Sequence, residues 1–149
     1  MRDASALPGM KVLEFAFDTL APSVYQPHTY HKNTICYIGT HDNMTAVQWL
    51  KALDPEVRAY AKAYMNLSEQ EGLVWGMIRT AMSSVSEICI LQMQDLLELD
   101  GEARMNFPGT TDHNWSWRAL SGSYHKTLAE KLRNLTALYG RLHHSIEQE

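Results

Sequence analysis

Four polar side chains, Thr40, His41, Asp42 and Asn43, follow the apolar run 35–38 after a single glycine. An imidazole beside a carboxylate can bind sugar hydroxyls, ligate a metal ion or transfer a proton. The same residue types also cap loops, because Asp and Asn side chains hydrogen-bond to nearby backbone groups. From the residue types alone, a functional cluster and a loop cap both stay open.

Other histidines in this part of the chain raise the question of a metal site. Imidazole and carboxylate groups suit zinc, so a set made of His28, His31, His41 and Asp42 is conceivable. None of these residues has the spacing of a tight ligand motif, and His143-His144 is more simply a solvated helix end. The sequence therefore predicts no metal site.

A second polar segment lies later in the chain. Arg104 and Asn106 stand beside Pro108-Gly109, where they can hold a ligand or tie a long loop to the scaffold. Trp115 and Trp117 can stack on sugar rings. Alternation of this kind is more typical of one buried and one half-exposed tryptophan, so a structural role is the favoured interpretation of the pair.

Three apolar runs, at 10–17, 33–39 and 87–93, have the length and residue types of strands. Helical spacing between them predicts alternating strands and helices, and hence an α/β fold with a parallel sheet. Functional groups of parallel sheets gather at the carboxyl ends of the strands. Both polar segments follow such ends, so we expect them to meet at one rim.

The helices are predicted from the spacing of apolar residues. In the first helical region, 47–57, Pro55 suits a first helical turn, and Ser68 is a plausible N-cap for the next helix. The last helix is expected to lie against another part of the protein along one apolar stripe. That stripe comprises Leu128, Leu132, Leu135, Tyr139, Leu142 and Ile146.

Glu14 is a carboxylate within the first predicted strand, where alternation places it on the same face as Val12 and Ala16. A buried carboxylate needs a partner. Glu14 is therefore either a member of a structural ion pair or a wall of the site, and the sequence does not separate the two.

Composition limits the class of protein. The 149 residues are 45% apolar and 20% charged, which is typical of one soluble globular domain. The net charge of −4 contains no basic block, so no nucleic-acid partner is expected. No apolar run is long enough for a membrane span and no signal core begins the chain, so we expect a cytoplasmic protein without a membrane partner. Cys36 and Cys89 are expected to be reduced and buried.

Five segments carry a family resemblance. In order and spacing, LPGMKVLEFAF, YIGTHDN, LQMQDLL, GEARMNFPGT and NWSWR resemble the carboxyl-terminal part of the 4-α-glucanotransferases, the amylomaltase or disproportionating-enzyme group called glycoside hydrolase family 77. The resemblance implies that residues 1–149 are a single portion of a (β/α)8 TIM barrel, containing strands six to eight and their helices. It also implies that the family's aspartate nucleophile and glutamate acid/base precede Met1.

The resemblance assigns roles to several residues. Asp42 would be the family's third carboxylate, which hydrogen-bonds the sugar ring during cleavage, and His41 would contact the same sugar. Arg104 and Asn106 would border the groove for a maltooligosaccharide or α-1,4-glucan. Thr40 and Asn43 are expected to hold the loop. No metal or organic cofactor is implied. Two departures are Met44-Thr45-Ala46 after the THDN motif and Glu14, where relatives often carry Gln.

The resemblance leaves two levels of function. The parent enzyme would transfer α-1,4-glucan segments by a retaining double displacement, whereas this chain alone would be inactive. The alternatives are a truncated product that binds maltooligosaccharides weakly and a standalone α/β binding domain. Three strands cut from a closed barrel would also leave two edges and an apolar face uncovered, which predicts self-association.

Overall fold

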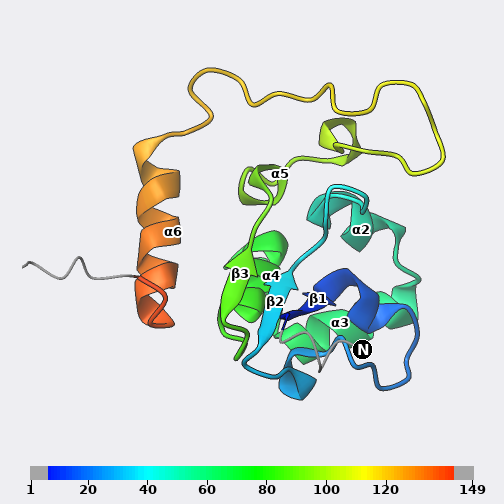
Figure 1. Ribbon diagram of the computed structural model, residues 1–149, viewed down its shortest axis with the longest axis vertical. Coiled ribbons are helices and arrows are strands. Elements are labelled where there is room, and N and C mark those ends of the chain that lie inside the picture. The colour runs from blue at the N-terminus through cyan, green and yellow to red at the C-terminus, as the bar shows by residue number, and fades with distance from the viewer. Residues whose placement is uncertain (1–6, 143–149) are drawn as a thin grey trace, which may run out of the picture. The chain divides into compact units, whose positions relative to one another are not determined.

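The computed structural model describes residues 7–142. The chain divides into two compact units, residues 1–119 and 120–149, which are treated separately. The first unit contains the sheet and most of the described helices, and the described part of the second, residues 120–142, contains one helix (Figure 1).

A parallel three-stranded sheet forms the centre of the first unit, as predicted. Strands β1 (Gly9–Val12), β2 (Thr34–Tyr37) and β3 (Ile88–Ile90) lie in the order β1-β2-β3, and both neighbouring pairs are parallel. The register aligns Cys36 with Cys89. Neither cysteine forms a disulfide within residues 7–142, but only Cys36 is buried, so the prediction of burial was wrong for Cys89.

The first strand is shorter than predicted. After Val12 the chain coils into the 3-10 helix η1 (Leu13–Phe17), which buries every side chain except that of Phe15. Glu14 therefore does not lie in a strand. Coiling lets Phe17 pack against aromatic rings of two helices, with ring centroids 6.2 Å from Trp49 and 5.4 Å from Tyr64. A short, mainly apolar run fits a strand or a buried helical turn equally well, so its pattern did not distinguish them.

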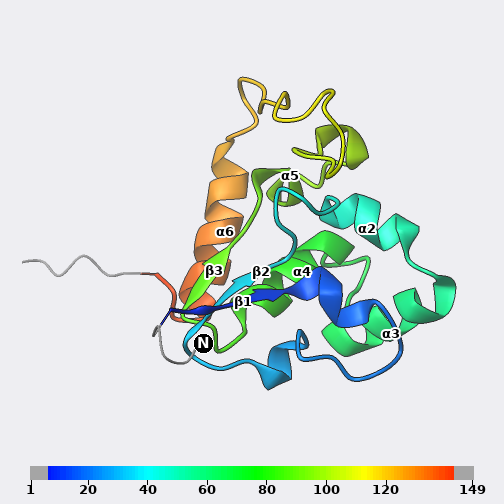
Figure 2. The same ribbon diagram turned by 45° about the vertical axis from the view of Figure 1, so that its right-hand side comes forward.

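Three helices follow β2 and lie on one side of the sheet, as Figure 2 shows. They are α2 (Ala46–Ala52), α3 (Pro55–Met65) and α4 (Leu73–Met82). Thr45 Oγ1 accepts a hydrogen bond from Gln48 N at 3.3 Å, and Pro55 occupies the first turn of α3 as predicted.

The predicted cap of α4 was wrong. Gly72 precedes this helix with φ of 92°, a conformation that glycine adopts without a side-chain clash. Ser68 instead accepts a hydrogen bond from Glu71 N at 3.2 Å, within the preceding turn. A serine that satisfies a turn and one that caps a helix look alike in sequence.

Two short elements follow β3. Helix α5 (Met93–Leu96) begins where the sequence predicted strand, and the 3-10 helix η3 (Gly101–Ala103) precedes the second polar segment. A further 3-10 turn, η2 (Pro27–Thr29), lies in the loop before β2. β3 therefore has only three residues, and the chain leaves the sheet earlier than predicted.

One face of the sheet carries exposed apolar side chains. Met10, Ile35 and Ile88 are register partners, and Met10 and Ile88 are 59% and 47% exposed. Ile90, two residues after Ile88 in β3, is 43% exposed. The predicted self-association depends on exposed apolar side chains of this kind. It stays a prediction, which sedimentation would check.

The second unit contains helix α6 (Lys126–Leu138). His125 Nδ1 accepts a hydrogen bond from Leu128 N at 3.1 Å and caps its first turn. The predicted stripe was too long, because the helix ends before Gly140, whose φ is 64°. Leu142 therefore lies beyond the helix, and Ile146 lies outside the described residues. Within residues 7–142, no helix is both long and apolar enough to cross a bilayer.

Candidate sugar-binding rim

The loop after β2 is held by its own polar residues. Asn43 Oδ1 accepts hydrogen bonds from Thr40 N at 2.9 Å and from Thr40 Oγ1 at 2.7 Å. Asn43 N in turn donates to Thr40 O at 3.0 Å. These bonds close a tight turn that projects His41 and Asp42 toward solvent. The predicted loop-holding role of Thr40 and Asn43 agrees with this geometry.

Asp42 is half exposed, and its two polar neighbours converge on one carboxylate oxygen. Asn106 Nδ2 donates to Asp42 Oδ1 at 2.7 Å, and His41 Nε2 lies 3.3 Å from the same atom. Between residues 7 and 142 no donor reaches Oδ2. The side chain is 50% exposed, so Oδ2 is free to accept hydrogen bonds from a ligand.

The second polar segment meets the first, as the parallel arrangement predicted. Arg104 Nη2 donates to Asp42 O at 2.7 Å, while Arg104 Nε donates to Asn106 O at 2.9 Å. Asn106 N also donates to His41 O at 3.1 Å. Of the two roles left open for Arg104, these contacts match the loop tie: its guanidinium joins the loop after β2 to the segment after η3.

We expect Arg104→Lys to lower the free energy of unfolding by about 1–2 kcal/mol, measured by urea denaturation. The planar guanidinium reaches two carbonyl groups in two segments, whereas an ammonium group on one flexible stem cannot reproduce that fork. The amide resonances of Asp42 and Asn106 should shift in the same variant. Wild-type stability together with unchanged resonances would contradict the tie.

Trp115 is the aromatic member of this rim. Its side chain is 55% exposed, and its ring centroid lies 4.9 Å from that of His41. Trp117 is half buried. The expectation of one buried and one half-exposed tryptophan was therefore wrong, because neither indole is buried. The loop instead turns back through Trp115 N, which donates to Met105 O at 2.7 Å.

Two buried carboxyl groups, from Glu14 and Asp95, lie beneath the loop. Glu14 is 3% exposed, and its Oε1 has no hydrogen-bond partner in the described part of the chain. A Cβ added at Gly39 would lie 2.9 Å from this atom. Glu14 forms no ion pair with residues 7–142, so the contacts favour a place in the wall under the loop.

Burial sets the protonation of both groups. Loss of solvation raises the pKa of Glu14 to about 9; the negative charge of Asp95 adds to this effect and the positive charge of Arg104 opposes it. Burial also raises the pKa of Asp95 to about 6, against hydrogen bonds from Ala46 N and from the Gln92 side chain. Glu14 is therefore neutral at pH 7, and Asp95 is mostly ionised.

Asp95 was missed by the sequence reasoning. Its Oδ1 accepts a hydrogen bond from Ala46 N at 2.8 Å, at the first residue of α2. The loop that carries Asp42 is thus held at its far end by a carboxylate from α5. A signal was present, because Asp95 lies two residues after the third predicted strand, 87–93, where a carboxylate within an apolar segment points to the rim.

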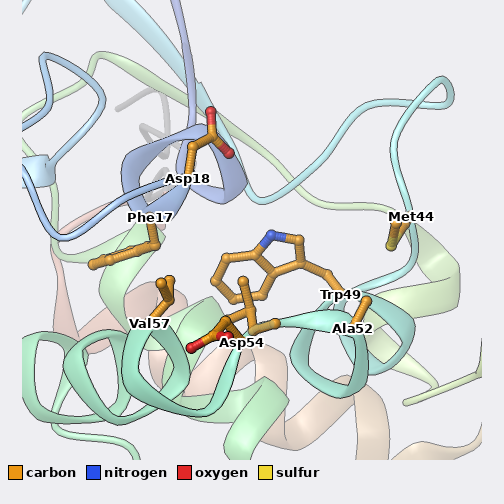
Figure 3. A pocket seen from close by; sticks show the side chains of 8 residues that line it. Phe17, Asp18, Met44, Trp49, Ala52, Asp54 and Val57 are labelled. Atoms are coloured by element: carbon orange, nitrogen blue, oxygen red, sulfur yellow. The ribbon is translucent and has the colours of Figure 1, made fainter.

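A pocket of about 290 Å³ is lined in part by Met44 from the same loop (Figure 3). The indole of Trp49 crosses its middle, with Met44 and Phe17 at its two sides. The remaining lining residues are Asp18, Ala52, Leu53, Asp54 and Val57. The sequence reasoning did not identify this pocket.

Residues 7–142 contain no group of three or more His, Cys, Asp or Glu side chains that could hold a metal ion.

Comparison with known proteins identifies the family of the chain. The family model for glycoside hydrolase family 77, 4-alpha-glucanotransferase, matches residues 1–123. The 4-alpha-glucanotransferase of Streptococcus pneumoniae serotype 4 is 43% identical over 147 residues, which are 98% of this chain and 29% of the relative. That of Clostridium butyricum is 44% identical over 138 residues, 92% of this chain and 28% of the relative.

A solved structure extends the likeness to the fold. The amylomaltase from Streptococcus agalactiae, in complex with acarbose, superimposes with a TM-score of 0.91 at 38% identity. The match covers 95% of this chain and 29% of that one, so the chain spans less than a third of the length of these relatives. The family match covers most of the sequence, and the chain therefore belongs to glycoside hydrolase family 77, the 4-alpha-glucanotransferases.

Proposed function

We propose that the protein to which this chain belongs transfers α-1,4-glucan segments between maltooligosaccharides. The reaction would be a retaining double displacement, in which one carboxylate attacks the anomeric carbon and a second protonates the leaving oxygen. Those two groups would come from the part of the relatives that the match does not cover. The three parallel strands would then be strands six to eight of the closed barrel.

Asp42 carries this proposal. With its neighbours gathered on Oδ1, its free Oδ2 can accept hydrogen bonds from hydroxyls of the sugar ring being cleaved. Such bonds strengthen as the ring flattens toward the oxocarbenium ion, so they lower the barrier rather than only tighten binding. His41 would contact the same sugar. Asn106 would hold the carboxylate in place, and Arg104 would fix the two segments that border the groove.

The activity can be tested by segment replacement. Residues 7–142 would replace the matching segment of the Streptococcus agalactiae amylomaltase, because the backbones agree with a TM-score of 0.91. The hybrid should convert maltotriose to glucose and longer maltodextrins. A folded hybrid without activity would contradict the proposal.

The second candidate function is a maltooligosaccharide-binding module without catalysis. It rests on the same rim, where the free Oδ2 of Asp42 can accept hydrogen bonds from sugar hydroxyls without a second carboxylate. The chain alone, incubated with maltotriose, should then give no products while it still binds a longer maltodextrin. Products from the chain alone would mean that its own carboxylates complete the reaction.

A further inference from the structure

We propose that the exposed indole of Trp115 is a stacking platform for a glucose unit beside the one that Asp42 contacts. This inference rests on the proposed function, since it names a further contact in the same rim. It adds an aromatic surface to a cluster in which the other assigned side chains are polar.

The position of Trp115 is set by its backbone and by one ring contact. Trp115 N donates to Met105 O, and its carbonyl accepts from Arg118 Nη1 at 2.8 Å. The indole lies against the imidazole of His41 at an interplanar angle of 42°. His41 in turn lies beside Asp42 Oδ1, so a ligand on Asp42 is within reach of the indole.

The backbone of this loop adopts conformations that side chains rarely favour. Trp115 has φ of 59° and His113 has φ of 60°. Left-handed conformations of this kind cost free energy in residues with bulky side chains, and they persist only where the surrounding bonds hold them. Here Asn114 supplies such bonds, because its Oδ1 accepts from Phe107 N at 2.8 Å and its Nδ2 donates to Thr110 O at 2.9 Å. These bonds therefore hold the large aromatic side chain of Trp115 at an exposed position.

A glucose ring offers hydroxyl groups at its edge and C–H groups on its faces. The edge suits the carboxylate and amide of Asp42 and Asn106, whereas the faces suit an aromatic ring. Phe107, the other exposed ring of this segment, is 38% exposed, and the guanidinium of Arg104 lies over it at 4.6 Å. Trp115 therefore has the larger open aromatic surface.

The test uses the chain as it is, labelled with ¹⁵N, and maltoheptaose as the probe. Its four indole N–H signals are assigned by single Trp→Phe variants, and the amide of Asp42 reports binding at the carboxylate. We expect the Trp115 indole to shift with the same saturation curve as that amide and to show intermolecular NOEs to sugar protons. The indole of Trp75, which is 4% exposed, serves as the internal control and should stay unchanged.

Two variants separate contact from support. Trp115→Ala should weaken maltoheptaose binding by about five- to tenfold, while Trp115→Phe, which keeps an aromatic face, should weaken it by less than about threefold. A titrating Asp42 amide without shifts or NOEs at Trp115 would overturn this inference and leave the proposed function standing. No shift at any residue would overturn this inference, while the proposed function would still be decided by the activity of the hybrid on maltotriose.

Discussion

Asp42→Asn should reduce disproportionation of maltotriose by a factor on the order of 10²–10³ in the amylomaltase hybrid described above. The amide keeps the shape of the side chain but removes its negative charge, which would face the positive charge that develops on the sugar. The effect should fall on kcat rather than KM, because the interaction strengthens only near the transition state. Initial rates of glucose release over a range of maltotriose concentrations would measure both constants.

The matched control is Asp112→Asn, which changes an exposed aspartate in the same rim segment. Its rates should stay within about twofold of the parent hybrid, as expected for a substitution of an exposed side chain. Equal losses in the two variants would indicate a general effect of charge. A loss confined to KM in Asp42→Asn would assign Asp42 to ground-state binding alone.

Glu14→Gln should stabilise the chain above neutral pH by several kcal/mol. The folded state raises the pKa of Glu14 from 4.5 to about 9, so the folded protein keeps a proton that the unfolded chain releases. Wild-type stability therefore falls as the pH rises from about 4.5 to about 9, by about 1.4 kcal/mol for each pH unit at most, and then levels off. Gln is neutral in both states and escapes this loss.

Urea unfolding at pH 5, 7 and 9 would measure the difference between the two proteins. It should be small at pH 5 and increase toward pH 9. The charges that face Glu14 are those of Asp95 from α5, Arg104 after η3 and Asp18 at the end of η1. Asp95 adds its own loss between pH 3.8 and about 6, which is common to both proteins. Glu102→Gln, at an exposed glutamate, is the matched control, and a constant difference across the pH range would contradict the prediction.

The sequence predicted the parallel sheet and the meeting of the two polar segments because both follow from general rules. Alternating strands and helices leave few arrangements, and parallel strands bring their carboxyl ends to one edge. For that reason Asp42 and Asn106 could be expected at one rim although a long stretch of chain separates them. Their hydrogen bond confirms it.

What the sequence did not predict depends on packing between distant residues. Leu13–Phe17 coils instead of extending because Phe17 meets the rings of α2 and α3, and those contacts have no local signature. The caps illustrate the same limit, since Ser68 and Gly72 compete within a few residues for the start of α4. The hydrogen bond from Ala46 to Asp95 joins the start of α2 to α5 through one buried oxygen, and no spacing rule predicts that contact.

The close approach of Glu14 to Gly39 restricts the order in which these two positions can change during evolution. A side chain at Gly39 would meet Glu14 Oε1 at 2.9 Å and Asn43 Cβ at 3.1 Å, so alanine there is harmful while the glutamate remains. If Glu14 is first replaced by a smaller residue, part of that obstacle disappears. The same substitution at Gly39 is thus harmful in one background and better tolerated in the other, so a buried carboxyl group makes the accessible mutational path depend on its history.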